Sequence, residues 1–411
     1  MPKPKILMLI TNLTFGGAQR VFHDHNLLLS TRFDVRDAVF NLADGQAFET
    51  PQPVIDLAVS GGGSWFNRIA NFARRVRRLS AIKRSLRPAL TISHLEGADY
   101  VNILSNGGGK RLLCVHGSKI HDANIRGPLG MIRKRLIIPR LYNRADCIVT
   151  VSREIAVELE SMGVRRELLR PIHNFFDAAA IRARSLEPLS AAEQSIFDGP
   201  PVLVTSGRLT LQKNQPPLLD IFAALLKRRS ARLLFLGDGE LRQALIDHAR
   251  SLGLRVAEQA GEDADVFFLG FQDNPFRFQR HAKAFVLSSG WEGFPMVLGE
   301  AMACGLPIVS ADCPTGPREF LAPDSIGHAA RPLRKAERGE HGLLMPVPAV
   351  GDQVTIDPWV ETLDRLLGDE AEREAMAAKS LARTEDFTRD KIGAQWLALV
   401  EELIDTPQTS A

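Results

Sequence analysis

Short apolar runs alternate with helical stretches from one end of the sequence to the other, and this alternation leaves few folds open. Each run is rich in branched or aromatic residues and is followed by turn-forming residues, as expected of a buried strand. Strands are predicted at residues 5–10, 34–40, 54–59, 89–93, 111–115 and 146–151, and again at 202–206, 233–237, 266–269, 283–287, 308–310 and 342–346. Repeated strand–helix units build a parallel, doubly wound sheet with helices on both faces. We therefore predict an α/β protein that binds ligands at the carboxyl ends of its strands.

The length of the chain predicts two domains. A chain of 411 residues suits two domains of about 150–200 residues each. Residues 178–200 are rich in alanine, proline and glycine, which predicts a linker. The expected organisation is an N-terminal Rossmann-like domain at 1–178, the linker at 179–200, a C-terminal Rossmann-like domain at 201–385, a helix at 386–404 and a disordered tail at 405–411.

Neither a membrane span nor an export signal is expected from the sequence. No run of 18 apolar residues occurs, and the apolar stretch at 6–10 is too short for a signal peptide. The four cysteines, Cys114, Cys147, Cys304 and Cys313, are scattered and do not have metal-binding spacing. Such a pattern is typical of buried thiols in a reducing compartment. We therefore expect a cytoplasmic protein.

The charge is distributed unevenly along the chain. Residues 1–180 carry 26 Lys and Arg against 15 Asp and Glu, whereas the remainder carries 25 against 33. Residues 65–88 hold eight basic residues and no acid, with apolar residues at helical spacing, and residues 126–144 form a second basic cluster. An ordinary surface helix, docked by its apolar stripe with its arginines facing outward, explains this pattern as well as an anionic membrane surface does. No nucleic-acid motif is present, so nucleic acid is not expected as a partner.

Residues 284–304 predict a strand, a loop and a helix that carry two glutamates. Glu292 lies in the loop, and Glu300 lies about one turn into the helix. Gly293 and Pro295 turn the chain sharply, so free backbone N–H groups and the helix N-terminus form an anion site. Carboxylates beside such a site suit the hydroxyl groups of a sugar or ribose. A bare pair of glutamates is also explained by a helix cap and a solvated helix surface.

The complete string from Glu292 to Val309 is more specific, and it resembles the donor-sugar signature of the retaining family 4 glycosyltransferases. This resemblance implies the GT-B fold, with two Rossmann-like domains facing each other across a cleft. It implies that Glu300 binds the nucleotide ribose and that Glu292 is catalytic, holding the sugar hydroxyls near the anomeric carbon. The other implied donor-binding positions of this string are Gly293, Phe294, Pro295, Met296 and Val297.

A second motif of the C-terminal half predicts a diphosphate site. The motif consists of Ser206-Gly207-Arg208-Leu209 and, three residues later, Lys213-Asn214. Its two cations, Arg208 and Lys213, could neutralise a diphosphate together. The pattern is similar to the family's phosphate-binding pair, which implies catalytic roles for Arg208 and Lys213 and donor contacts for Ser206 and Gly207. Gly270 and Phe271 match the place where the family holds the nucleotide base with backbone groups. No Asp-x-Asp metal signature is identified, so no metal or other cofactor is expected.

The N-terminal half holds weaker signals. Gly16 and Gly17, at the end of the first strand, are similar to the family's first loop, which faces the donor phosphates and the acceptor. His116 matches the family's catalytic histidine beside the donor sugar. The predicted acceptor-side residues are His94, Glu96 and Asn174, which follow or close other strands of this half.

The resemblance implies a transferase that uses a nucleotide-sugar donor, with UDP first and GDP second. The loop Gly316-Pro317-Arg318-Glu319 is similar to that of bacterial transferases of cell-surface sugars, so the expected acceptor is a glycan or polyprenyl-diphosphate-linked sugar at the inner membrane face. The charged insertion at 324–341 departs from the family pattern and is expected to be a mobile loop without an assigned role. A nucleotide-sugar 2-epimerase and a catalytically inactive partner subunit remain as alternatives.

Overall fold

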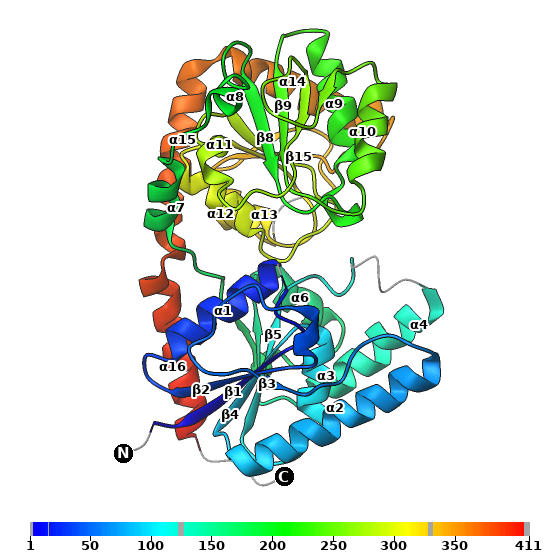
Figure 1. The fold of residues 1–411 in the computed structure, drawn as a ribbon, viewed down its shortest axis with the longest axis vertical. Helices are drawn as coiled ribbons and strands as arrows, with labels where there is room; N and C mark the ends of the chain where they lie inside the picture. Colours follow the sequence, from blue (N-terminus) through cyan, green and yellow to red (C-terminus); the bar gives the residue numbers. More distant parts are fainter. Residues whose placement is uncertain (1–2, 15, 122–126, 328–331, 407–411) are drawn as a thin grey trace. The chain divides into compact units, whose positions relative to one another are not determined.

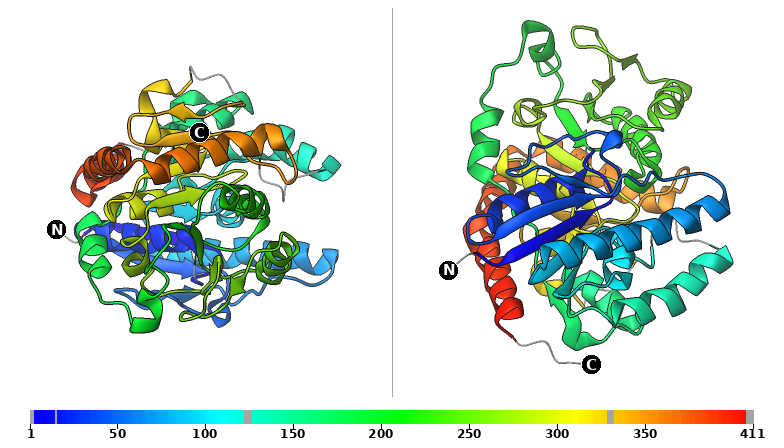
Figure 2. Two further views of the ribbon diagram at one scale, coloured as in Figure 1. Left: turned by 90° about the horizontal axis from the view of Figure 1, so that it is seen from above. Right: turned by 60° about the horizontal axis from the view of Figure 1, so that its bottom comes forward.

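The structure, a computed structural model, describes residues 3–14, 16–121, 127–327 and 332–406. The chain divides into two compact units, shown in Figures 1 and 2. Unit 1 comprises Met1–Asn174 and Asp390–Ala411, and unit 2 comprises Phe175–Arg389. Each unit has its own sheet and its own core, as expected of two doubly wound domains.

Unit 1 contains a seven-stranded parallel sheet in the order β3-β2-β1-β4-β5-β6-β7. Its strands are β1 (Lys5–Ile10), β2 (Asp34–Val39), β3 (Ile55–Asp56), β4 (Leu90–His94), β5 (Lys110–Val115), β6 (Cys147–Thr150) and β7 (Leu169–Pro171). The expected strand at 54–59 is wrong beyond its first residues. The Asp56 carboxylate accepts the N–H of Ala58 at 2.7 Å, and Ala58 has φ 47°, so the regular strand ends there, although Leu57 N and Val59 N still donate to Val39 O and Phe40 O.

Helices cover both faces of this sheet (Figure 1). The helical segments are α1 (Gly17–Leu29), η1 (Leu42–Asp44), α2 (Trp65–Leu86), α3 (Glu96–Leu104), α4 (Gly127–Ile132), the π-helical η3 (Arg133–Ile137), α5 (Ile138–Tyr142), α6 (Arg153–Ser161), η4 (Arg166–Leu168) and α16 (Arg389–Asp405). Leu7 and Leu9 of β1 pack with Leu79 of α2 and Val101 of α3 in one apolar cluster. Successive strand residues point to opposite faces, so Ile6, Met8 and Ile10 of β1, which are also buried, face the other side of the sheet.

The apolar stripe of α2 docks on the sheet, but the expectation that its arginines face outward is wrong for Arg75 and Arg78, whose guanidinium groups bind backbone carbonyls. Arg75 lies 4.3 Å from the centre of the Phe40 ring and donates to Val59 O at 3.1 Å, and Arg78 donates to Leu57 O. Lys83 is buried and donates to Asn102 Oδ1 at 2.8 Å, and burial lowers its pKa to about 7. These cations therefore hold the loop before α2 and the end of α3 through backbone carbonyls.

Unit 2 contains an eight-stranded sheet in the order β10-β11-β9-β8-β12-β13-β15-β14, parallel except for the β14–β15 pair. Its strands are β8 (Val202–Ser206), β9 (Arg232–Leu236), β10 (Val256–Ala257), β11 (Val266–Phe268), β12 (Ala284–Leu287), β13 (Ile308–Ala311), β14 (Glu337–Arg338) and β15 (Leu343–Met345). The core packs strand residues such as Phe235 against α9 and against Trp359 of α14.

The helical segments of unit 2 are α7 (Ala178–Ser185), α8 (Ala191–Gln194), η5 (Leu211–Lys213), α9 (Pro216–Leu226), α10 (Arg242–Ser251), α11 (Phe276–Gln279), α12 (Met296–Ala303), α13 (Pro317–Leu321), η6 (Pro323–Ser325), α14 (Gln353–Gly368), α15 (Glu370–Thr384) and η7 (Glu385–Phe387). The segment predicted as a linker, 179–200, contains most of α7 and all of α8 and belongs to unit 2. Asp177 caps α7, and Ser190 and Glu193 form a capping box on α8, so local hydrogen bonds stabilise helices in this alanine-rich segment.

The insertion at 324–341 is held in place where the structure describes it. Glu337, in β14, binds Arg318 at 2.5 Å, and Arg338 binds Glu372 of α15 at 2.6 Å. These ion pairs correct the expectation of a mobile loop for β14, whereas residues 328–331 lie outside the described residues. Of the expected disordered tail at 405–411, residues 407–411 also lie outside them. None of the described helices is both long enough and apolar enough to cross a membrane.

Candidate active site

The carboxyl ends of β8 and β12, which are neighbours in the sheet of unit 2, bring Lys213 and Glu292 into direct contact. Lys213 Nζ lies 2.7 Å from Glu292 Oε1, and the side chains are 15% and 6% exposed. The same Oε1 accepts from Ser289 Oγ at 2.6 Å. Gln212 Nε2 donates to the carbonyl of Trp291 at 3.0 Å, so η5 and the β12–α12 loop are joined at several points.

The position of Lys213 is fixed by the residues that follow it. Asn214 adopts a left-handed conformation with φ 51°, which ends η5 abruptly. Its side-chain amide donates to Ser288 O at 3.2 Å and to Pro348 O at 2.9 Å. Gln215 Nε2 donates to Arg208 O at 2.9 Å, so the backbone that carries Arg208 is held as well. The local sequence therefore directs the lysine to the strand ends.

Glycines let the ends of three strands approach one another closely. Gly207 N donates to Leu236 O at 2.9 Å, and Gly237 N donates to Gly270 O at 2.8 Å. A Cβ atom added to Gly237 would lie 2.0 Å from Gly207 O, so a larger residue would push the loops apart. Arg208 is exposed beside these turns, and Phe271, which follows Gly270, is also exposed. Ser206, the last residue of β8, is half-buried at the same edge.

The loop before α12 is packed tightly. A Cβ atom on Gly316 would lie 2.6 Å from Pro295 Cδ and 2.8 Å from Gly293 O, so this glycine allows the two loops to touch. The Phe294 ring is buried, with its centre 4.2 Å from that of Phe320. A donor contact of Phe294 therefore has to come from its backbone. The half-buried Met296 and Val297 begin α12, and Glu300 lies one turn further on, half-buried.

His94 and His116 form a hydrogen-bonded pair at the ends of β4 and β5 in unit 1. His94 Nδ1 lies 2.9 Å from His116 Nε2, whereas the buried His94 Nε2 has no partner in the described part of the chain. A proton on His94 Nδ1 is therefore favoured, which leaves the N–H of a neutral His116 on its Nδ1. Burial and the charge of Lys119 lower the pKa of His116 to about 3, so the ring is neutral at pH 7.

Glu96, predicted on the acceptor side, is the centre of a buried ion-pair cluster. Its carboxylate lies 3.1 Å from Lys119 Nζ and 2.5 Å from Arg133 Nε, and it accepts from the Tyr100 hydroxyl. Burial opposes ionisation, but the charge of Lys119 and the hydrogen bonds from Arg133 and Tyr100 lower the pKa of Glu96 to about 2. These contacts join α3, the loop after β5 and η3, so Glu96 has a clear structural role.

The other predicted residues of unit 1 lie at its strand ends. Gly17 begins α1, and a Cβ atom on Gly16 would lie 2.3 Å from Gln19 Oε1. Gln19 Nε2 in turn donates to Asn12 Oδ1 at 2.8 Å. Asn174 is buried, and its Oδ1 has no hydrogen-bond partner in the residues that the structure describes.

Two buried residues organise these loops: Glu158, which sequence reasoning missed, and Arg318, which it had noted in a motif without assigning it a contact. Glu158 of α6 accepts from Ser118 Oγ at 2.7 Å and from the N–H groups of Lys119 and Ile120, and so holds the loop after His116. Arg318 forms two hydrogen bonds to Asp312, at 3.1 and 2.7 Å, below the loop that contacts Pro295. Glu158 gave no signal in the sequence, because it is a single acidic residue inside a predicted helix. Arg318 belongs to the Gly-Pro-Arg-Glu motif, which the sequence analysis had noted.

An Asp-x-Asp triplet does occur, at Asp263 and Asp265, contrary to the expectation. Asp265 precedes β11 and so lies at the amino ends of the parallel strands, whereas Lys213 and Glu292 lie at the carboxyl ends. Arg255 forms ion pairs with both carboxylates of the triplet, at 2.7 Å to Asp265. Across the described residues, no group of three or more His, Cys, Asp or Glu side chains is placed to hold a metal ion.

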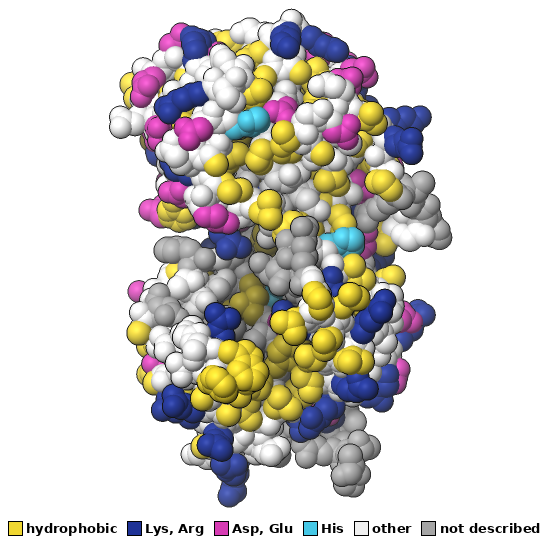
Figure 3. Space-filling view, turned by 90° about the vertical axis from the view of Figure 1, so that its right-hand side faces the viewer, with side chains coloured by type: hydrophobic (Ala, Val, Ile, Leu, Met, Phe, Trp, Pro, Cys, Tyr) yellow, Lys and Arg dark blue, Asp and Glu magenta, His cyan; other side chains and the backbone are white. Residues whose placement is uncertain are grey.

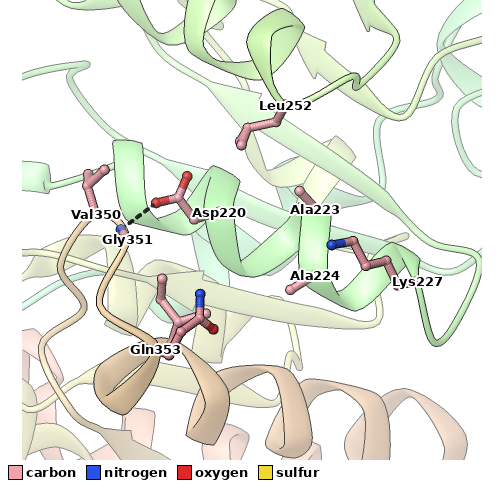
Figure 4. A pocket seen from close by; sticks show the side chains of 9 residues that line it. Asp220, Ala223, Ala224, Lys227, Leu252, Val350, Gly351 and Gln353 are labelled. Atoms are coloured by element: carbon pink, nitrogen blue, oxygen red, sulfur yellow. Dashed lines mark hydrogen bonds between the residues drawn. The ribbon is translucent and has the colours of Figure 1, made fainter.

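A separate hollow of about 330 Å³ lies beside α9 and the start of α14 (Figure 4). Its lining is largely apolar, and its carboxylate, Asp220, already accepts from Gly351 N at 3.1 Å and contacts His248 Nε2 at 2.7 Å. The hollow contains neither of the predicted cations Arg208 and Lys213. It is therefore not part of the candidate active site.

Two family models match the chain. The model described as Glycosyltransferase Family 4 matches residues 15–180, and the one described as Glycosyl transferases group 1 matches residues 188–338. Together with two parallel sheets of the GT-B kind, these matches show that the chain belongs to the family 4 glycosyltransferases.

Known proteins resemble the chain over most of its length. An uncharacterized glycosyltransferase of Methanocaldococcus jannaschii is 28% identical over 355 residues, which is 80% of this chain and 84% of that protein. An N-acetylgalactosamine-N,N'-diacetylbacillosaminyl-diphospho-undecaprenol 4-alpha-N-acetylgalactosaminyltransferase of Campylobacter jejuni is 24% identical over 94% of this chain and 97% of its own. The structure of Anabaena HepE in complex with UDP and glucose has a TM-score of 0.72 at 19% identity, covering 97% of this chain and all of that chain.

Proposed function

We propose that this protein is a retaining glycosyltransferase that moves a hexose or N-acetylhexosamine from a UDP-sugar to a lipid-linked or cell-surface glycan, without a metal ion. The observation that carries the proposal is the contact of Lys213 with Glu292 at the carboxyl ends of β8 and β12. A largely buried Lys–Glu pair is a weak source of stability. Its place at the ligand-binding edge of a parallel sheet is better explained by a role toward a ligand.

The lysine and the glutamate have complementary tasks in this proposal. The Lys213 ammonium has three N–H donors, and one is used by Glu292. The remaining donors, with the exposed guanidinium of Arg208, neutralise the diphosphate of the donor. Glu292 accepts hydrogen bonds from sugar hydroxyls, and Glu300 accepts from the ribose. The fixed Asn214 holds Lys213 so that little reorganisation is needed when charge develops on the leaving group.

The bond changes follow from this placement. The bond between the anomeric carbon and the phosphate oxygen breaks with its electron pair going to the oxygen, so negative charge develops on the departing UDP until that oxygen is protonated. The acceptor hydroxyl attacks the same face of the sugar and gives its proton to the departing phosphate oxygen. Configuration is therefore retained, and no protein nucleophile is required. Arg208 and Lys213 supply the stabilisation that a metal ion supplies elsewhere. A contact of neutral His116 with the donor sugar remains part of the proposal.

The relatives support the choice of donor and acceptor. The Anabaena structure of the same fold holds UDP and glucose. The name of the Campylobacter relative specifies a sugar acceptor linked to diphospho-undecaprenol. A second relative, a lipopolysaccharide 1,6-galactosyltransferase of Salmonella typhimurium, is 25% identical over 49% of this chain and 57% of its own. We infer a UDP-sugar donor and a polyprenyl-diphosphate-linked or surface-polysaccharide acceptor from these three proteins.

A donor screen tests the proposal. Purified protein is incubated with UDP- and GDP-sugars, with and without EDTA, and release of nucleoside diphosphate is followed together with the anomeric configuration of the sugar. We expect slow hydrolysis of a UDP-sugar, unaffected by EDTA, with an α-anomeric product from an α-linked donor. Loss of activity in EDTA would refute the metal-free site, and a β product would refute retention. Binding without release would favour an inactive subunit, and an epimerised nucleotide-sugar would favour a 2-epimerase.

A further inference from the structure

The segment formed by α4 and η3 in unit 1 exposes large apolar side chains, while two of its three cations bind groups of the protein. Arg133 points into the protein to bind Glu96, and Lys134 donates to Ile120 O. Apolar side chains are exposed instead: Leu129, Met131, Ile132, Leu136 and Ile137. Leu129 is 81% exposed, the highest value among the exposed large hydrophobic side chains. A surface helix normally hides its apolar stripe, so this face fits an apolar environment.

The start of α2 also exposes apolar residues. From Phe72 onward the helix packs against the sheet, but all six residues from Trp65 to Ala70 are exposed. Ser64 accepts from Asn67 N at 3.4 Å, so this overhang begins as a capped helix. Trp65, Phe66 and Ile69 lie on it, and the first two rings meet edge to face with centres 5.1 Å apart. Aromatic rings at a helix end are typical of the boundary between lipid headgroups and acyl chains.

The two elements project from the same side of unit 1 (Figures 1 and 2). Figure 3 views this side and shows, in its lower half, apolar side chains gathered together with Lys and Arg around them. Of the eleven large hydrophobic side chains that the structure shows exposed in unit 1, eight belong to the overhang of α2 or to α4 and η3. We call these eight residues and the exposed arginines of α2 the α2–α4 surface.

The positive charge of this surface indicates which kind of partner it binds. Arg68, Arg74 and Arg77 are exposed on α2, and no acidic residue occurs between Asp56 and Glu96. A two-fold contact with a second copy would oppose one arginine-rich α2 to another, which like-charge repulsion disfavours. Nucleic acid would match the arginines but not the exposed aliphatic side chains. A bilayer that contains anionic lipid matches both.

We propose that the α2–α4 surface docks this protein on a membrane containing anionic lipid. The apolar side chains enter the headgroup boundary, and the arginines bind lipid phosphates. This proposal does not rest on the donor chemistry, because none of these residues belongs to the Lys213–Glu292 site. It identifies the part of unit 1 that would face a lipid-linked acceptor.

Vesicle flotation of the full chain tests this docking. Vesicles of phosphatidylcholine with phosphatidylglycerol should float the protein at low salt, whereas pure phosphatidylcholine vesicles and added salt should release it. Trp65→Ala with Phe66→Ala should lower the partition constant about tenfold or more, because two inserted aromatic rings are lost. Arg68→Gln with Arg77→Gln should lower it by roughly 25-fold at low salt, with about fivefold for each cation near the surface.

Matched controls separate docking from damage to the fold. Leu186→Ala with Val354→Ala removes two exposed apolar side chains of unit 2. Arg182→Gln with Arg228→Gln removes two exposed arginines of unit 2. Both double variants should float like the wild type. All variants should keep the wild-type rate of donor hydrolysis without vesicles. Absence of flotation at low salt, or flotation that the α2 variants do not change, would overturn the proposal. Sedimentation experiments give a further test. If the wild type is a dimer and Trp65→Ala with Phe66→Ala dissociates it, the surface binds a second copy and the proposal is overturned.

Discussion

Replacing Lys213 by methionine should slow turnover much more than it weakens donor binding. The lysine is 15% exposed and lies 2.7 Å from Glu292, so its ammonium is held where the leaving diphosphate is expected. The diphosphate gains a negative charge as the glycosidic bond breaks, and the interaction with Lys213 therefore grows in the transition state. Loss of one fixed donor to a developing anion reduces kcat by about 10² to 10³, or about 2.7–4 kcal/mol. Arg208 and the backbone N–H groups remain, so the KM for the donor should change by less than about fivefold.

The same substitution tests the buried ion pair. Methionine leaves the Glu292 carboxylate, 6% exposed, with Ser289 at 2.6 Å but without its cation. Breaking a buried pair costs about 3–5 kcal/mol at most, and the serine should keep the loss in the free energy of unfolding nearer to 2 kcal/mol. Kinetics are therefore measured well below the melting temperature, which is recorded for each variant.

Steady-state assays of donor hydrolysis and transfer give kcat and KM separately. Lys227→Met, at an exposed lysine that follows α9 and lines the hollow in Figure 4, is the matched control and should leave both constants unchanged. A value of kcat for Lys213→Met within tenfold of the wild type, in a folded protein, would refute the role of the lysine. A large rise in KM at constant kcat would show uniform binding of the diphosphate instead.

Three further substitutions test separate parts of the structure. Glu300→Ala should raise the donor KM about tenfold or more with little change in kcat, because a charged hydrogen bond to the ribose is lost; equal KM values would contradict the assignment. Arg318→Met should lower the free energy of unfolding by about 3–5 kcal/mol in denaturant titrations, because the side chains of Arg318 and Asp312 are both 1% exposed. Adding Asp312→Asn should restore part of the lost free energy, because the unpaired buried charge is then removed. The pKa of Glu96 is about 2 in the folded chain, against an ordinary value of 4.5. The ionised carboxylate therefore adds about 3 kcal/mol to the free energy of unfolding above pH 4.5, and this contribution is lost as the pH falls toward 2. The difference in unfolding free energy between the wild type and Glu96→Gln should shrink over that pH range, and a constant difference would refute the ion-pair cluster.

Much of the fold follows from local sequence patterns. The strand at 5–10 is found as β1, and the apolar runs of the C-terminal half are found as β8, β9, β11, β12, β13 and β15. These strands are buried on both faces, so their continuous apolar character is a strong local signal. The short β7 and β14 had no such signal, because three or fewer residues give no periodicity.

Contacts made across the sequence were harder to predict. Lys213 and Glu292 are 79 residues apart, and only the family resemblance suggested that they act together. The inward turn of Arg75 and Arg78 depends on hydrogen bonds to the backbone carbonyls of residues 57–60, which no helical periodicity reveals. In the segment predicted as a linker, alanine and proline indicated a connection, whereas the caps formed by Asp177 and Ser190 stabilise the helices α7 and α8 there.

Calorimetric titration with UDP tests the central claim most directly, because it asks whether Arg208 and Lys213 bind a nucleoside diphosphate. Wild-type protein is compared with an Arg208→Ala, Lys213→Met double variant and with an Arg228→Ala, Lys227→Met control, all in EDTA. We predict that UDP binds the wild type and the control equally and binds the double variant at least tenfold more weakly. Equal affinity of all three proteins for UDP, or no binding to the folded wild type, would contradict the placement of the donor at this edge of the sheet.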